Sequence, residues 1–248
     1  MKTYVITGAG SGIGRAITKQ LANEGHQCIL IGRNQGHLKE TVDGLEGNHR
    51  ILAADIRSLT EMKALAAELQ DTAIDGIMAN AGIGGENHWG EQDRWQEIIE
   101  TNLTGTYNLV NSLLPNLKKS EAAYKHIIIT SSVLARLGVE NYSAYCASKA
   151  GLLGLMRSWA VQFAPQNILV NAICPGWVNT EMSVAGMEGI AKGLGITRAE
   201  FHDIAMQSVP LRKMSEPEEI GQLISYLLKQ RSITGQTIDI NNGAVMNS

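Results

Sequence analysis

Residues 2–17 of the chain, KTYVITGAGSGIGRAI, decide its fold. The segment begins as a short apolar strand, passes through a turn in which four of seven residues are glycine, and continues as an amphipathic helix. Glycine permits a tight turn and close approach to the backbone, and the free N–H groups at the start of a helix attract negative charge. The segment therefore predicts a cradle for the pyrophosphate of a dinucleotide. The residues expected to form it are Gly8, Ser11, Gly12, Ile13 and Gly14.

Apolar, strand-like runs alternate with amphipathic helical stretches along the rest of the chain. Such alternation predicts right-handed crossovers and a doubly wound parallel α/β sheet of about seven strands, with helices on both faces. Because no linker or low-complexity stretch divides the sequence, we expect a single domain over 1–248. Within it, the Met- and Gly-rich segment 180–214 is expected to be a substrate lid. The runs expected as later strands are 27–31, 50–54, 74–79, 126–130, 168–173 and 237–240.

The composition argues against several classes of protein. A net charge of −3 over 248 residues gives no basic field for nucleic acid. No apolar run approaches the roughly 18 residues that span a bilayer, and the first strand begins too close to Met1 for a signal peptide. The three cysteines, an odd number, lie in expected strands or helices, which is typical of reduced thiols. We therefore expect a cytoplasmic protein that binds neither membrane nor nucleic acid, and the sequence indicates no metal site.

A proton-transfer site is indicated by Tyr145 and Lys149, four residues apart, with Ser132 thirteen residues before Tyr145. Residues four apart share one face of a helix, so the Lys149 charge can lie near the Tyr145 hydroxyl and favour its phenolate. A phenol with the ordinary pKa of about 10 is a poor acid–base catalyst at neutral pH unless that pKa is lowered. Taken alone, a Tyr and a Lys at this spacing are more often a pair on a helix surface.

The motifs occur together in an order that resembles the short-chain dehydrogenase/reductase family over essentially the whole chain. The resemblance implies a Rossmann-type fold and an oxidoreductase that transfers a hydride between a nicotinamide and a carbonyl or secondary alcohol. It also implies a homo-oligomer, either a dimer or a tetramer. The matching residues are Thr7 to Gly14 for the glycine motif, Asn80-Ala81-Gly82, the helix residue Asn102, Ser132, Tyr145 with Lys149, and the turn Pro175-Gly176.

The resemblance also implies a role for each matching residue. Tyr145 would supply the proton, Ser132 would hydrogen-bond the same substrate oxygen, and Lys149 would lower the Tyr145 pKa and hold the ribose. Asn102 would keep a water that links Lys149 to solvent. Asp55, followed by Ile56, matches the family's position against the adenine, although an Asp there could simply cap the next helix. The segment expected around the carboxamide contributes Pro175, Gly176, Val178 and Thr180.

The choice of cofactor depends on the turn after the second strand. Proteins that hold the free ribose hydroxyl of NAD carry an acidic residue about 20 residues after the glycines, and 25–39 contains none. Gly32 stands where the family's NAD-dependent members usually have Asp, and the next residue is Arg33. A guanidinium can bind a 2′-phosphate with a planar, always-charged fork. We therefore expect NADP(H), with NAD(H) and a solvent-facing Arg33 as the alternative.

The substrate is indicated only by class. Residues 208–212 (SVPLR) and 215–219 (SEPEE) look like the lid exit of the branch that holds 3-oxoacyl carrier-protein reductases and related ketoreductases. We expect a small carbonyl or alcohol substrate, with an acyl thioester included in that class. Two other hypotheses stay open: an NAD-dependent alcohol dehydrogenase of the same family, and a non-catalytic NADP(H)-binding sensor.

A homo-oligomer is also favoured by the helix after Tyr145, which carries more apolar residues than one core face needs. Family members usually pair the helices that carry the Tyr and the Asn, so these residues are expected to meet a second copy. They are Leu152, Leu153, Leu155, Met156, Trp159 and Ala160.

Overall fold

The computed structural model describes residues 1–246 and contains one seven-stranded parallel sheet in the order β3-β2-β1-β4-β5-β6-β7. The order reverses between β1 and β4, and ligands of doubly wound sheets bind at such a reversal, beyond the carboxyl ends of the strands. The predicted doubly wound α/β fold is thus confirmed. The strands are β1 Thr3–Thr7, β2 Gln27–Gly32, β3 Arg50–Ala53, β4 Gly76–Ala79, β5 Lys125–Thr130, β6 Ile168–Pro175 and β7 Thr237–Ile240.

Two strand boundaries differ by two residues from those expected, each with a local cause, and the other boundaries agree to within one residue. β4 begins two residues later because the N–H of Ile74 donates to the carbonyl of Asn116 at 3.2 Å, in the helix beneath, and not to a neighbouring strand. β6 runs on to Pro175 because β7 pairs along its end, with Pro175 level with Ile240. The longer β6 carries the Pro175-Gly176 turn directly to the ligand-binding edge.

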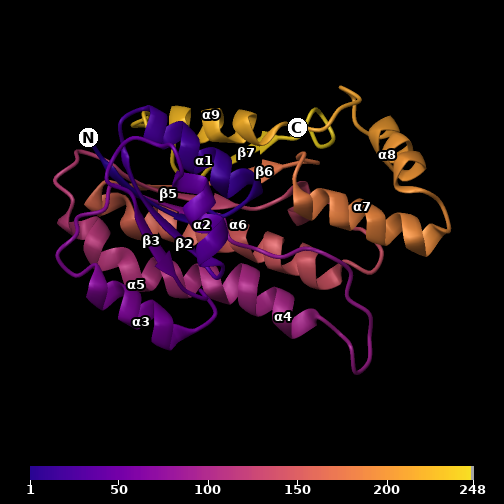
Figure 1. Ribbon diagram of the computed structural model, residues 1–248, viewed down its shortest axis with the longest axis horizontal. Helices are drawn as coiled ribbons and strands as arrows, with labels where there is room; N and C mark the ends of the chain where they lie inside the picture. The colour runs from indigo at the N-terminus through magenta and orange to yellow at the C-terminus, as the bar shows by residue number, and fades with distance from the viewer. Residues whose placement is uncertain (247–248) are drawn as a thin grey trace.

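Helices cover both faces of the sheet, as Figure 1 shows. α1, α2 and α9 share one apolar core with the sheet, and α3, α5 and α6 share the other. The helices are α1 Gly12–Asn23, α2 Gln35–Val42, α3 Leu59–Glu68, α4 Trp95–Ile99, α5 Gly105–Lys119, α6 Ser143–Phe163, α7 Glu181–Leu194, α8 Arg198–Gln207 and α9 Pro217–Leu227. A π-helical turn, η1 Glu100–Thr104, joins α4 to α5, and two short 3-10 turns are η2 Val133–Ala135 and η3 Ala164–Gln166. None of the helices in the described part of the chain is long and apolar enough to cross a bilayer.

The prediction that α6 leaves many apolar residues for a second copy is wrong for most of them. α6 lies against β6 and is also covered by α4, so its apolar face is buried within the chain, while Ala147, Ala150, Arg157 and Val161 on its outer side are exposed. Only Leu155 stays half-buried. The residues already buried are Leu152, Leu153, Met156, Trp159 and Ala160.

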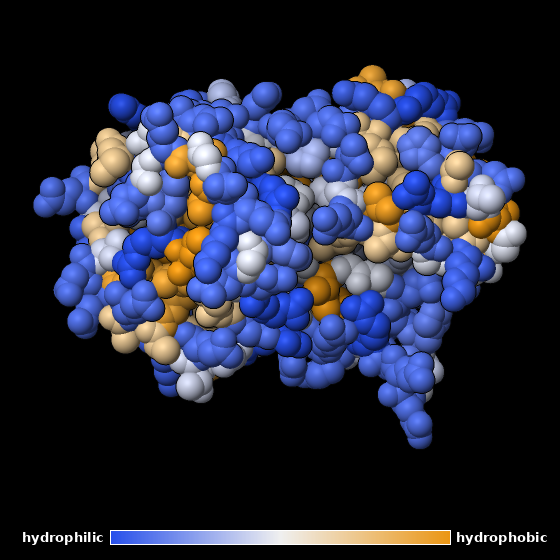
Figure 2. Space-filling model, viewed as in Figure 1, coloured by the Kyte–Doolittle hydropathy of each residue, from blue (hydrophilic) through white to orange (hydrophobic). Residues whose placement is uncertain are grey.

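Segment 180–214 contains α7 and α8, which project from the body at the right of Figure 1. The two helices form a small apolar cluster of Met187, Met206 and Val209, separate from both cores of the sheet. On the same side of the molecule, the loop between β4 and α4 forms a hydrophilic protrusion, visible at the lower right of Figure 2. Both segments therefore border the carboxyl edge of the sheet.

Candidate active site

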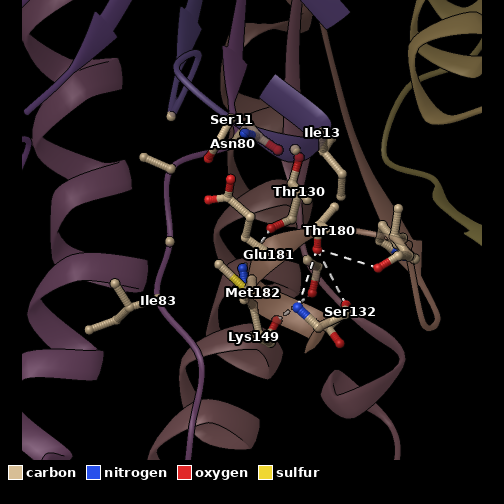
Figure 3. Close-up of a pocket in the computed structure, with 18 of the residues that line it drawn as sticks. Ser11, Ile13, Asn80, Ile83, Thr130, Ser132, Lys149, Thr180, Glu181 and Met182 are labelled. Atoms are coloured by element: carbon tan, nitrogen blue, oxygen red, sulfur yellow. Dashed lines mark hydrogen bonds between the residues drawn. The ribbon is translucent and has the colours of Figure 1, made fainter. Parts of the chain in front are cut away.

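A groove with two lobes runs along the carboxyl edge of the sheet. The first lobe, of about 190 Å³, is lined by Ser132, Tyr145 and Lys149, and part of it is drawn in Figure 3. The second lobe, of about 220 Å³, is lined by Arg33 and Asp55. We call them the Tyr145 lobe and the Arg33 lobe. They meet around the glycine-rich turn, because both are lined by Gly8, Ser11, Ala81, Gly82 and Ile83.

The structure brings nearly all of the predicted residues to this groove. The Arg33 lobe also contains Ile56. Gly14 and Asn102 do not line either lobe and lie directly behind the walls. The remaining predicted residues in the Tyr145 lobe are Gly12, Ile13, Asn80, Pro175, Gly176, Val178 and Thr180.

The glycine-rich turn requires its glycines for two different reasons. Gly8 and Gly12 have φ values of +64° and +45°, in the left-handed region that favours glycine. Gly14 has an ordinary φ, but a Cβ there would lie 2.1 Å from the carbonyl oxygen of Gly8. The turn therefore packs against the first turn of α1. The N-cap residue Ser11 makes no side-chain cap, which leaves the N–H groups at the start of α1 facing the groove.

Thr7 ties the carboxyl ends of β1 and β4 together. Its hydroxyl oxygen accepts hydrogen bonds from the backbone N–H groups of Asn80 and Ala81, both at 3.0 Å. In return, the Asn80 side-chain amide donates to the Thr7 carbonyl at 3.1 Å. This buried threonine fixes the wall shared by the two lobes. The sequence motif contains Thr7 but does not reveal this role.

Tyr145 and Lys149 extend from the first two turns of α6, and Ser132 lies two residues beyond the end of β5, before η2. The ammonium of Lys149 is 5.5 Å from the centroid of the Tyr145 ring and donates to the Thr130 carbonyl at 2.9 Å. The Ser132 hydroxyl accepts from the backbone N–H of Leu134 at 3.1 Å, which orients its oxygen at the rim of the lobe. The three side chains therefore meet in one lobe, as predicted.

The expected lowering of the Tyr145 pKa is not seen. Burial raises the pKa of Tyr145 to about 12, and a hydrogen bond with the Ser132 side chain offsets this only in part. Burial also lowers the pKa of Lys149 to about 8, since its charged form is disfavoured away from water. In this structure the pKa of Tyr145 is thus set by burial and Ser132, not by Lys149, and the phenol keeps its proton at neutral pH.

Asn102 is fully buried in the π-helical turn and braces the site from behind. Its side-chain oxygen accepts from the N–H of Ile83 at 2.8 Å, and its amide donates to the Ile83 carbonyl and to the Ser148 hydroxyl, both at 3.0 Å. Gly82 separates Asn102 from Lys149: a Cβ there would lie 3.1 Å from the Asn102 oxygen and 3.4 Å from the Lys149 nitrogen. Asn102 therefore positions the groove wall and does not touch Lys149.

The far side of the Tyr145 lobe is formed by the segment after β6. The Thr180 hydroxyl caps α7 by accepting from the N–H of Ser183 at 3.3 Å. Glu181 and Met182, at the start of α7, complete the lining, and Figure 3 shows both beside the cavity. These two residues belong to the expected lid 180–214 but are not among the residues predicted for the site. Ile83 and Thr130 are not among them either, since only the fold brings them to the groove.

In the Arg33 lobe, the guanidinium of Arg33 lies on the same cavity as the carboxylate of Asp55, which is paired with Arg57. The Asp55 carboxylate accepts three hydrogen bonds from the Arg57 guanidinium, at 3.1, 2.9 and 2.6 Å, and this contact lowers the Asp55 pKa. Arg33 forms no ion pair with any residue of the described chain. Its neighbour Asn34 accepts from the N–H groups of Gly36 and His37 and so caps α2. The guanidinium of Arg33 is therefore available to a ligand.

A family model described as short chain dehydrogenase matches residues 2–190, which contain the glycine turn, Ser132, Tyr145 and Lys149. The chain belongs to the short-chain dehydrogenase/reductase family. A 3-oxoacyl-acyl-carrier-protein reductase FabG of Thermotoga maritima is 31% identical, over 99% of this chain and 98% of its own. The oxidoreductase UcpA of Salmonella typhimurium is 34% identical, over 99% and 95%. A solved actinorhodin polyketide ketoreductase with NADPH has a TM-score of 0.90 at 29% identity, over 98% of this chain and 97% of that one.

This short-chain dehydrogenase is accordingly an oxidoreductase, and its fold implies a nicotinamide cofactor. The groove fits such a molecule. Its two lobes join at open helix N–H groups suited to a pyrophosphate. A Cβ on Gly10 would come within 2.9 Å of His37, which lines the Arg33 lobe, and one on Gly12 within 3.0 Å of Thr180, which lines the Tyr145 lobe. Residues of both lobes therefore pack closely against the glycine-rich turn. An elongated dinucleotide would thus lie with one end near Arg33 and the other near Tyr145.

Proposed function

We propose that this enzyme reduces the carbonyl group of a small ketone, of the 3-oxoacyl type or a close relative, with NADP(H). One observation carries the proposal: a single groove joins a free guanidinium at one end to Tyr145, Ser132 and Lys149 at the other. The first group suits a 2′-phosphate and the second suits an oxygen that gains negative charge.

The cofactor, when bound, supplies the hydride. Tyr145 donates its proton to the carbonyl oxygen as negative charge develops there, and a pKa of about 12 ensures that the phenol holds this proton at neutral pH. Ser132 donates a hydrogen bond to the same oxygen. Lys149, 4% exposed, holds the ribose and supplies positive charge near the phenol. Asn102 positions Ile83 and, as the family resemblance implies, keeps a water between Lys149 and solvent.

The site residues proposed for the cofactor are those that line the two lobes. Arg33 binds the 2′-phosphate, Asp55 and Ile56 border the adenine, and Thr180 with the Pro175-Gly176 turn faces the carboxamide. We further propose that 180–214 acts as the substrate lid of a single-domain enzyme, because Met182 and Glu181 line the Tyr145 lobe from its first helical turn. The names of the ketoreductase and FabG relatives favour a ketone that includes acyl thioesters.

Cofactor preference tests the proposal directly. A charge-assisted, bidentate contact from Arg33 is worth roughly 2–3 kcal/mol, a preference for NADPH over NADH of about 30- to 150-fold in kcat/KM. The double variant Gly32→Asp with Arg33→Ala would repel the phosphate and bind the free hydroxyl, reversing the order. A Cβ at Gly32 meets only the tip of Leu38, at 3.3 Å, so the new side chain can be accommodated.

The measurement is kcat/KM with each cofactor over a panel of ketones, for the wild type, the double variant and a control. Arg50→Ala is a suitable control, because Arg50 pairs with Glu68 at 2.8 Å and does not line the groove. A wild type that already favours NADH would establish the alternative, an NAD-dependent alcohol dehydrogenase with Arg33 in solvent. Tight NADPH binding with no turnover on any ketone or alcohol would establish the non-catalytic sensor.

A further inference from the structure

A second cavity, of about 480 Å³, opens at the amino ends of β1 and β5, on the edge of the sheet opposite the Tyr145 lobe. The ends of α1 and α9 and the segment 122–124 enclose it. None of its lining residues belongs to either lobe of the groove. The reductase reaction proposed above makes no use of this cavity.

The floor of this amino-edge cavity is a row of three residues across the sheet. Tyr4 of β1 is level with Gly76 of β4, and Gly76 is level with His126 of β5. A Cβ on Gly76 would lie 3.1 Å from the Tyr4 ring, so the glycine lets that ring lie over the strand. Tyr4 and His126, both 2% exposed, are thereby held side by side on the same face of the sheet.

Polar groups of this floor have no hydrogen-bond partner in the part of the chain that the structure describes. Among residues 1–246, neither the Tyr4 hydroxyl nor the His126 ring makes a hydrogen bond. The Nδ1 atom of His26 is buried and equally unpaired, and its ring packs edge-on against Tyr4 with centroids 5.2 Å apart. Buried polar groups are almost always hydrogen-bonded. The unpaired His26 nitrogen is buried, and the Tyr4 hydroxyl and the His126 ring beside it make no hydrogen bond with the described residues, so all three are available to water or a ligand in the cavity.

The rim of the cavity carries unbalanced positive charge. Lys2 and Arg231 form no ion pair in the described part of the chain. Lys229 pairs with Glu24 at 2.9 Å, and Glu24 also accepts a hydrogen bond from the Ser225 hydroxyl. The one carboxylate of the rim is thus already satisfied and does not neutralise Lys2 or Arg231. Donors converge on the cavity from several directions, which suits the several acceptor oxygens of a phosphate.

We propose that the amino-edge cavity binds a phosphomonoester of a small organic molecule. Lys2, Arg231 and the imidazoles of His26 and His126 hold the phosphate, and the organic part lies against the Tyr4 ring and Leu228. The volume supports an esterified ligand, since sites for small organic molecules span about 300–1,000 Å³ and a bare ion would fill only part of this one.

The test is an NMR titration of the histidine side chains with inorganic phosphate and then with glycerol 3-phosphate. Binding in the cavity shifts the ring signals of His126 and His26, whereas binding in the cofactor groove shifts His37, which lines the Arg33 lobe. Saturating the protein with NADPH first blocks the groove. We expect glycerol 3-phosphate to bind with a Kd on the order of 1 mM or tighter, and more tightly than phosphate.

A second readout is the pKa of His126, which burial and the charge of Lys2 lower to about 4. The charged groups around the cavity are Lys2, Glu24, Lys229 and Arg231, and in addition the N-terminal ammonium acts on His26 and Asp75 acts on Tyr4. A bound dianion favours the imidazolium, so the His126 pKa should rise in its presence. Water alone in the cavity would leave this pKa unchanged.

Variants locate the site. Lys2→Met and Arg231→Gln should each weaken binding by about tenfold or more, Lys2→Arg should restore it, and Lys63→Met on α3 is the matched control. Absence of His126 and His26 shifts in the NADPH-saturated protein would overturn the proposal. So would equal binding by the Lys2 and Lys63 variants, or equal binding of acetate and the phosphate esters.

Discussion

Asn87 connects the loop after β4 to the helix that carries Tyr145, and its replacement tests how that helix is positioned. Asn87 is 3% exposed. Its side-chain oxygen accepts from the N–H of Ala144 at 2.9 Å, in the first turn of α6, and its amide donates to Asp93 and to the Ser143 hydroxyl. The N-cap residue of α6, Tyr142, makes no side-chain cap. A residue some 57 positions earlier in the chain therefore caps this helix.

Asn87→Ala removes the cap and leaves buried partners unpaired. A lost cap costs about 1 kcal/mol, and an unsatisfied buried partner costs about 1–3 kcal/mol, so unfolding in urea should require about 2–4 kcal/mol less. Because Tyr145 follows Ala144 directly, a shift of the first turn misplaces the phenol, and misplacement by about 1 Å can cost about 100-fold in rate. We expect kcat to fall 10- to 100-fold while the Kd for NADPH, measured by fluorescence, changes little.

Asn87→Asp keeps an acceptor for the Ala144 N–H and should recover part of kcat, although it sets a second carboxylate beside Asp93. Asn23→Ala, at the exposed end of α1, is the control for an asparagine change elsewhere. If Asn87→Ala unfolds more easily but keeps the wild-type kcat, the cap stabilises the protein without positioning Tyr145, and the reasoning above is refuted.

Three further predictions concern the catalytic set and assembly. Tyr145→Phe removes one oxygen, so folding and NADPH binding should survive while ketone reduction falls by roughly 10²- to 10⁴-fold; comparable turnover would remove Tyr145 from the mechanism. Lys149 is charged below its pKa of about 8 and neutral above it. Lys149→Met should therefore weaken NADPH binding and remove the change of rate near pH 8 from the pH profile, and normal affinity with an unchanged profile would contradict this role. Light scattering should return a dimer or tetramer that buries Tyr107 of α5, 49% exposed and stacked on Trp159 at 6.3 Å; a monomer of about 27 kDa would contradict it.

The sequence predicted the fold and most of the groove because the relevant signals are local. A strand, a glycine turn and a helix follow one another within 2–17, and parallel strands bring all such turns to one edge. Residues such as Gly12, Arg33 and Lys149 therefore reach the groove through short-range structure alone.

The remaining features depend on contacts between distant segments. The pKa of Tyr145 is set by burial, which no spacing of Tyr and Lys reveals. The apolar residues of α6 are covered by β6 and α4. This burial follows from where α6 lies against the sheet, which the spacing of its apolar residues does not reveal. Asn87 appears in the sequence as an ordinary loop asparagine, since its partners near Ser143 lie in another part of the chain.

The π-helical turn Glu100–Thr104 sets the rotation of the buried residues of α4 relative to those of α5. At 3.6 residues per turn, the nineteen steps from Ile98 to Leu117 would end about 100° from the starting direction, yet both side chains are fully buried. A π-turn takes up one extra residue, which offsets about one such step. Deleting a single residue from 100–104 would restore regular α-helical hydrogen bonding and leave eighteen steps, or five full turns, between Ile98 and Leu117, so the flanking helices would keep their phase. The turn itself would change, and Asn102 would lose the position from which it bonds Ile83 and Ser148. A change that perfects the helix would thus unseat Asn102 and weaken the enzyme.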